Sequence, residues 1–488
     1  MAQPRKLLGA FLAAVLLAAG GGLAAAAPAG AQADDGELRP MIFVHGFLGS
    51  GQQFESQALR FASNGYPEDL IEMFEHDSLS FPGSQAEVFA RLDTLIADLQ
   101  SSSGSEQVNL LGHSQGTGLV QGYLNSSAER AADVAQYVNL DGGPGGTVPA
   151  TVETLAVWGE GDPARQLPGA TNVQFAEQGH TEVVNSPETF AAIYEHFTGE
   201  EPEFGEVVRE PADEIEVSGR AIFFPQNTGA TGGVLNIYEV DGETGLRLDD
   251  EPVATFEPSA DGNWGPFDAD GDAYYEFAVT RDDLTHHIFT QRFVRSTRWA
   301  RLLTSEPDGL ANSFWEFSDD HENLVVFRNK EWWADQGGAS DALTVNGESV
   351  LNAANSPRTN RTIAIFLHDF GLDRRSDIAT PVSPTGIPFL TGVDLFIPAA
   401  DPPTGTVAVE AEPRLGDGPE AVCVPNYSST RHRVSVQLNS YHHLLDAEGA
   451  SAEGHAAPEC GPAPVPPVVP PVVPPPAVPI PGEPDFSG

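Results

Sequence analysis

Lysine is nearly absent from this 488-residue sequence, and basic residues are few overall. Lysine and arginine number 24 against 70 aspartates and glutamates, giving a net charge of -46 at pH 7. This charge repels nucleic acid phosphates and anionic membranes, so electrostatic binding to either is excluded. Because Lys6 and Lys330 are the only lysines, one hypothesis is a surface that stays hydrated in salt. The alternative is GC-rich codon usage.

Long hydrophobic runs are confined to the N-terminus. Two basic residues precede the apolar run 7–17, and a small-residue stretch ends in AQA at 31–33. This pattern is typical of a secretory signal peptide over residues 1–33, so we expect the mature chain to be secreted. No later stretch reaches the ~18 apolar residues of a membrane-spanning helix, so no transmembrane segment is predicted.

Cysteine is also scarce, with Cys423 and Cys460 as the only two. In an oxidising compartment they predict a disulfide that joins the last domain to its tail. Two cysteines without a histidine cluster cannot form a structural zinc site. The acidic run at 268–272 lacks the sixth-position glycine and twelfth-position glutamate of an EF-hand, so it predicts a turn. We therefore expect no metal and no organic cofactor.

The remaining composition, 40% hydrophobic, supports two to four folded domains and excludes a disordered or fibrous protein. Residues 34–198 alternate short apolar runs with helical patterns, which predicts an α/β domain with a mostly parallel sheet. Its last helix should begin after Ser186, with Pro187 first, and end at Gly199. The expected strands are 41–44, 108–111, 137–140, 155–158 and 173–175.

An acidic linker is expected over residues 199–215. Beyond it, short alternating strands separated by Gly, Asp and Asn turns predict an all-β region, sandwich or barrel. We expect two units there, 216–310 and 311–445. Residues 446–488 then form a Pro-rich tail, whose proline repeats predict an extended polyproline spacer.

The segment Gly112-His113-Ser114-Gln115-Gly116 follows an apolar strand and opens a helical pattern. The flanking glycines permit the sharp strand-to-helix turn that places a nucleophile in a strained backbone conformation. Ser114 is therefore the predicted nucleophile. His45-Gly46-Phe47 follows the first strand, where a hydrolase with its serine on such a turn places a second oxyanion donor. We predict the amides of Phe47 and Gln115 as the oxyanion hole, and His45 as a residue that braces its loop.

A serine nucleophile needs a base and an acid, in the chain order Ser, acid, His. His180 lies in a loop between the last strand and the last helix, whereas His196 lies within that helix, so His180 is the predicted base. Two aspartates follow strands at suitable positions, Asp162 and Asp141. Either would hold the histidine tautomer and stabilise the imidazolium, and the sequence leaves both open.

The segments at 45–67, 112–116 (GHSQG), 139–143 (NLDGG) and 178–180 (QGH) together resemble the α/β-hydrolase lipases. In particular the chain is similar to an archaeal carboxylesterase/lipase with a β-rich C-terminal lipid-binding domain. The likeness continues past the linker through the segments 291–295, 299–301, 345–347 and 431–437, and so covers most of 38–440.

This resemblance implies Ser114 as nucleophile, His180 as base and the amides of Phe47 and Gln115 as oxyanion donors, and it places the acid at Asp141. The chain departs from the relative at the helical lid. Here residues 74–77 lead almost directly into the helical pattern 85–99. We therefore expect a site that no lid covers.

The predicted function is a secreted serine carboxylic-ester hydrolase, a lipase or esterase, that forms an acyl-enzyme. Its expected partners are a lipid or other ester substrate and, weakly, lipid aggregates or a cell wall. One alternative is a depolymerase of a polyester or cutin-like substrate, with the β region as docking module. A non-enzymatic alternative is a cell-surface binding scaffold, but such a protein has no need to retain every position of the hydrolase site.

Overall fold

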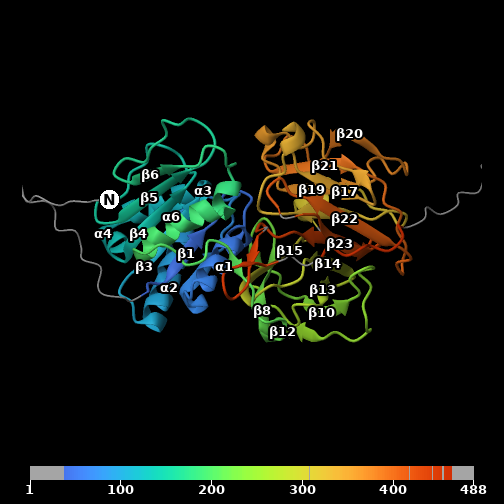
Figure 1. The fold of residues 1–488 in the computed structure, drawn as a ribbon, viewed down its shortest axis with the longest axis horizontal. Helices are drawn as coiled ribbons and strands as arrows, with labels where there is room; N and C mark the ends of the chain where they lie inside the picture. The colour runs from blue at the N-terminus through green and yellow to red at the C-terminus, as the bar shows by residue number, and fades with distance from the viewer. Residues whose placement is uncertain (1–37, 307, 417, 442, 453–455, 464–488) are drawn as a thin grey trace, which may run out of the picture. The chain divides into compact units, whose positions relative to one another are not determined.

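The computed structural model describes residues 38–306, 308–416, 418–441, 443–452 and 456–463. All of them belong to one unit that begins at Leu38. The predicted signal peptide, and the predicted Pro-rich tail from residue 464 onward, lie outside the described residues (Figure 1).

A parallel sheet of six strands carries the first part of the chain (Figure 1). The order is β2-β1-β3-β4-β5-β6, and every neighbouring pair is parallel, which confirms the predicted α/β class. Strand β2 was not predicted, because Glu72 interrupts its short apolar run at the edge of the sheet. The strands are β1 Met41–Val44, β2 Ile71–Phe74, β3 Val108–His113, β4 Val134–Leu140, β5 Glu153–Trp158 and β6 Thr171–Gln174.

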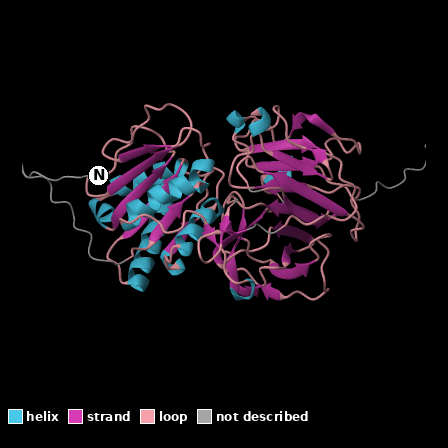
Figure 2. Ribbon diagram, viewed as in Figure 1, coloured by secondary structure: helices cyan, strands magenta, loops and turns pink. Residues whose placement is uncertain are grey.

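Helices cover both faces of this sheet (Figure 2). They are α1 Glu55–Ser63, α2 Gln85–Ser103, α3 Gln115–Ser126, α4 Ala128–Ala132, α5 Glu182–Asn185 and α6 Pro187–Thr198. Successive strand residues point to opposite faces. Accordingly, Met41 and Phe43 pack with α1 and α6, whereas Ile42 and Val44 pack with α2 and α3.

Helix α6 has the predicted ends. The Ser186 side chain accepts a hydrogen bond from the Thr189 amide, Pro187 occupies the first turn, and Gly199 adopts the left-handed conformation at the C-terminus. These local signals fix a helix that packs its apolar face on the sheet and begins just after the loop of His180.

The rest of the chain is rich in strands, as predicted. A nine-stranded sheet has the order β11-β10-β13-β14-β24-β16-β19-β21-β20, and smaller sheets are formed by β12-β8-β15 with β9, by β18-β17-β22-β23 and by β26-β25-β7. The strands are β7 Val207–Val208, β8 Ile215–Phe223, β9 Thr228–Gly229, β10 Val234–Val240, β11 Ala254–Phe256, β12 Asn263–Ala269, β13 Tyr274–Arg281, β14 Leu284–Thr290, β15 Thr297–Thr304, β16 Leu324–Phe327, β17 Ala342–Val345, β18 Glu348–Ser349, β19 Ala364–His368, β20 Asp377–Val382, β21 Leu390–Asp394, β22 Thr406–Glu412, β23 Glu420–Pro425, β24 His432–Gln437, β25 Leu444–Leu445 and β26 Ser451–Ala452. Short 3-10 helices are η1 Gly51–Phe54, η2 Glu68–Leu70, η3 Ala212–Glu214, η4 Ala311–Phe314, η5 Gly337–Ala339 and η6 Arg358–Asn360.

The two predicted β units share the nine-stranded sheet. Strand β24 lies between β14 and β16 and is parallel to both, so it joins strands from the two sides of residue 310. Cys423 on β23 forms a disulfide with Cys460, which confirms the predicted pair. The acidic run at 268–272 begins in the last two residues of β12 and continues into the turn that follows the strand, where a turn was expected.

The segment predicted as a linker is tied to the fold. Within 199–215, β7 pairs with β25, and the Val208 amide donates to the Ser63 hydroxyl on α1. Further along, Val294 and Trp299 are part of the same buried core as α1 and α6, and the Trp299 indole donates to the Ile71 carbonyl. The β region and the α/β region therefore share a hydrophobic core. None of the described helices has the length and apolarity of a membrane span.

Candidate active site

Ser114 lies at the turn between β3 and α3, with a positive φ of 52°. Such a backbone is costly for a residue with a side chain and marks a site where structure enforces strain. The glycines around it are needed for contact: a Cβ on Gly116 would lie 2.3 Å from the Val44 carbonyl oxygen, and one on Gly112 would lie 2.8 Å from the Gly116 oxygen. The predicted nucleophile elbow is thus formed as a strained strand-to-helix turn.

The loop after β1 is arranged around the amide of Phe47. The Gly46 amide donates to Gln53 Oε1, and the Leu48 amide donates to the Ser78 hydroxyl. Within the described part of the chain, the amides of Phe47 and Gln115 have no hydrogen-bond partner. Both predicted oxyanion donors are therefore available, and the bonds on either side of Phe47 hold its loop.

His45 is buried, and its ring holds this loop in place through hydrogen bonds. Its Nδ1 donates to the Gly46 carbonyl, and its Nε2 accepts from the His76 amide and from Asn227 Nδ2. Burial lowers the pKa of His45, while the nearby Glu75 carboxylate opposes that change. A neutral imidazole satisfies all three bonds, which is the bracing role expected for this residue.

His180 and Asp141 are joined by a hydrogen bond of 2.6 Å from His180 Nδ1 to Asp141 Oδ2. The other carboxylate oxygen accepts a hydrogen bond from the Gly159 amide at 2.9 Å and forms an ion pair with Arg165 Nη1, also at 2.9 Å. Burial alone would raise the pKa of Asp141, but the bond to His180 and the other donors hold that pKa below its ordinary value. An ionised Asp141 favours the tautomer with the proton on His180 Nδ1, which leaves Nε2 able to accept a proton.

Asp162 lies elsewhere. Its side chain is exposed and accepts from the Ala164 amide in the turn after β5. The structure thus brings Asp141, and not Asp162, to His180. The reason is that Asp141 directly follows β4 beside the elbow, whereas Asp162 lies four residues beyond the end of β5.

His113 was not singled out from the sequence, although it precedes Ser114 in the elbow. It is buried, its Nδ1 accepts from Gln53 Nε2, and its Nε2 donates to the His180 carbonyl. Burial holds the pKa of His113 well below its ordinary value, so a neutral His113 connects Gln53 to the loop that carries His180. Arg165, which bonds Asp141, was likewise missed, since it follows Asp162 in an unremarkable turn.

Ser114 and His180 line one small cavity, and the β region supplies much of its wall. The ring of Phe389 stacks on His180 at 6.0 Å between centroids. As predicted, no helix lies between β2 and α2. That no lid covers the site stays a prediction, and apolar side chains distant in sequence form part of the cavity wall: Phe224, Phe327, Ile363 and Phe389.

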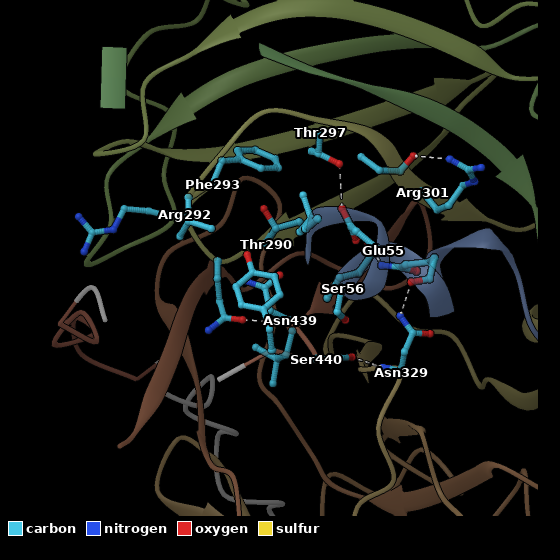
Figure 3. A pocket seen from close by; sticks show the side chains of 18 of the residues that line it. Glu55, Ser56, Thr290, Arg292, Phe293, Thr297, Arg301, Asn329, Asn439 and Ser440 are labelled. Carbon is cyan, nitrogen blue, oxygen red and sulfur yellow. Dashed lines mark hydrogen bonds between the residues drawn. The ribbon is translucent and has the colours of Figure 1, made fainter. Parts of the chain in front are cut away.

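A second cavity lies between α1 and the β region, and Figure 3 shows the side chains that line it. Glu55 faces it from α1, Thr297 and Arg301 from β15, and Asn329 and Ser440 from loops. Neither Ser114 nor His180 belongs to it. Burial raises the pKa of Glu55 to about 7, although Arg301 opposes that change.

Over the residues that the structure describes, no group of His, Cys, Asp and Glu has the arrangement of a metal site.

Comparison with known protein families matches residues 213–307 to the Lipase C-terminal domain and residues 311–442 to a second family of C-terminal domains. No curated protein sequence matches the chain. Among solved structures, Aspergillus fumigatus lipase B is similar at 13% identity over 34% of this chain and 54% of its own, with a TM-score of 0.26. Bacillus licheniformis lipase BlEst2 in propeptide form is similar at 10% identity over 81% and 94%, with a TM-score of 0.27.

Two observations bear on the kind of protein this is, the order of the parallel sheet and the match to the Lipase C-terminal domain. Both agree with the resemblance seen in the motifs, while the particular likeness to an archaeal protein stays a prediction. The chain has an α/β core built on a six-stranded parallel sheet, followed by a β-rich region whose residues 213–307 match the Lipase C-terminal domain.

Proposed function

We propose that this protein is a secreted serine hydrolase of carboxylic esters, a lipase or esterase, that works through an acyl-enzyme. The observation that carries the proposal is the 2.6 Å bond from His180 to a buried Asp141, in a cavity that also contains Ser114 on its strained turn. This combination of nucleophile, oriented base and anionic support is the arrangement that acyl transfer requires.

In the first half of the reaction, Ser114 Oγ attacks the ester carbonyl carbon while its proton passes to His180 Nε2. The oxyanion that forms is stabilised by the amides of Phe47 and Gln115. The carbonyl reforms as the bond to the alcohol oxygen breaks, and His180 gives its proton to that oxygen. The alcohol leaves, and the acyl group remains on Ser114.

In the second half, water replaces the alcohol. His180 Nε2 takes a proton from the water, whose oxygen attacks the acyl carbon, and the proton then returns to Ser114 Oγ as the carboxylic acid departs. Asp141 stays ionised throughout and stabilises the imidazolium of each step. No cofactor enters this scheme.

The wall of the cavity favours an apolar acyl group. Leu48, Phe224, Phe327 and Phe389 line it, and transfer of a hydrocarbon chain to such surroundings is favourable. We propose lipid or other acyl esters as substrates, and lipid aggregates as a weakly bound surface. Secretion is supported by the leader sequence and by the Cys423–Cys460 disulfide, which suits an oxidising compartment.

The test is Ser114→Ala, with Ser126→Ala at the end of the same helix as control. Both variants and the parent are assayed with p-nitrophenyl esters of increasing acyl length, with emulsified triglyceride, and with an organophosphonate probe. We expect Ser114→Ala to lose turnover and labelling, and Ser126→Ala to keep both. Labelling at another serine, or a parent protein without activity on any ester, would overturn the proposal.

A further inference from the structure

The loop that carries His180 is held by a side chain from the β region. The amides of Thr181 and Glu182 donate to the two carboxylate oxygens of Glu331, at 2.5 and 2.9 Å. Glu331 lies in the loop after β16 and is fully buried. Two charge-assisted bonds to consecutive amides fix the backbone immediately after the base.

Gly179, immediately before the base, is shaped by the same carboxylate. A Cβ at Gly179 would lie 2.7 Å from the Glu331 carboxyl carbon and from both of its oxygens. The Gly179 amide donates to Glu182 Oε2 at 3.1 Å, and the His180 carbonyl accepts from His113 at 2.9 Å. The backbone on each side of His180 is therefore anchored, and Glu331 packs against the one residue of the loop that has no side chain.

Glu331 is itself held rigidly. Its carbonyl accepts from Arg328 Nη2 and from Arg414 Nη1, each at 2.6 Å. Arg414 also bonds Glu182 at 2.8 Å and Asp341 at 2.6 Å. Arg328 bonds the other oxygen of Asp341 at 2.9 Å. The two arginines thus connect Glu331 and Glu182, beside the loop of His180, to Asp341 of the β region.

The charges of this buried cluster are balanced. It contains three acids and three bases: Glu182, Glu331, Asp341, Arg328, Lys330 and Arg414. Burial alone would raise the pKa of Glu182, but Arg414 and Lys330 hold it below its ordinary value. Removal of one charge leaves a buried partner without compensation, so the cluster resists rearrangement.

We propose that Glu331 is a positioning residue for the base: it holds the backbone around His180 so that the imidazole keeps its bond to Asp141 and stays in the cavity that Ser114 also lines. This inference rests on the proposed function. It assigns the β region a part in the chemical step, because a residue 151 positions beyond His180 in sequence completes the support of that residue. A misplacement of about 1 Å can cost ~100-fold in rate even when it starts away from the reacting atoms.

The test compares Glu331→Gln, Glu331→Asp and the control Glu276→Gln in the full-length protein. Glu276 is a buried carboxylate of β13 that pairs with Arg247 and His287. With a soluble p-nitrophenyl ester, we expect Glu331→Gln to lower kcat by about 10- to 100-fold with little change in KM, and to slow phosphonate labelling of Ser114 in parallel. Glu331→Asp keeps the charge and should recover part of the rate. Glu276→Gln should lower the melting temperature and leave kcat unchanged.

A second pair of variants keeps the test valid if Glu331→Gln unfolds. Gly179→Ala introduces a methyl group against the carboxylate and should lower kcat, while in the background of Glu331→Ala the same methyl group should cost little. Strictly additive effects, or a folded Glu331→Gln with the parent's kcat, would overturn the positioning role. In either of these two cases the parent protein still hydrolyses esters. If the proposed function itself is wrong, the parent protein has no activity on esters, so the two failures can be told apart.

Discussion

Glu55→Gln tests the electrostatics of the cavity between α1 and the β region. Burial raises the pKa of Glu55 from 4.5 to about 7, although Arg301 and a hydrogen bond from Thr297 oppose this. A pKa that is higher in the folded state contributes stability that is full below the unfolded value and is lost as pH rises through the folded one. At ~1.4 kcal/mol per pKa unit, the loss between pH 4.5 and pH 8 is on the order of 3 kcal/mol.

Glutamine keeps the neutral shape of the protonated acid at every pH, so Glu55→Gln removes this loss. Urea unfolding of the variant and the parent should give similar free energies at pH 5. At pH 8 the variant should be more stable, by up to ~3 kcal/mol. Glu87→Gln, at an exposed position of α2, serves as control and should follow the parent. Parallel pH profiles for Glu55→Gln and the parent would refute the reasoning.

Three further results are expected. Asp141→Asn should lower kcat by on the order of 10⁴-fold because the imidazole takes the wrong tautomer, and the matched Asp162→Asn should leave kcat nearly unchanged; equal losses would contradict this. Deletion of residues 214–488 should abolish turnover even on soluble esters, and measurable kcat in the truncated chain would show that the β region is dispensable. The melting temperature should rise from low salt to about 1 M NaCl, because screening relieves the repulsion of a chain with a net charge of -46; a flat trend would remove the halotolerance hypothesis.

The elbow could be predicted from the sequence because all of its determinants are local. A buried strand, two glycines that no larger residue could replace and a helix that begins at once lie within about a dozen residues around Ser114. The ends of α6 were predictable for the same reason, since Ser186, Pro187 and Gly199 act on their own backbone. Short-range sterics and capping decide such features, and they are visible in one sequence.

The choice of acid could not be made from the residues alone. Asp141 and Asp162 both follow strands of the parallel sheet. A strand pattern does not show which of the two side chains lies next to His180. Asp141 has a positive φ of 44° and lies directly beside the base. Only the resemblance to known lipases indicated that position, and the 2.6 Å bond to His180 now supports it.

The contribution of the β region to the site could not be predicted from the sequence either, because it depends on contacts between segments that are distant in sequence. Asn227 bonds the Gly49 carbonyl of the oxyanion loop, and Glu331 bonds the amides after His180. Each residue is an ordinary polar side chain in its own sequence context. Their importance follows from where the β sheets place them, and no local pattern carries that information.

The scarcity of basic residues acquires a physical meaning from these contacts. The side chains of Lys330, Arg301, Arg328 and Arg414 are almost inaccessible to solvent, and they pair with acids that hold the β region against the loops of the site. Because these buried bases are paired with buried acids, the pairs add almost no net charge, and the net negative charge of the chain is carried by its surface. Salt screens exposed charges strongly and buried pairs weakly. Added salt should therefore relieve repulsion at the surface while it leaves the ion pairs that support the catalytic loops intact.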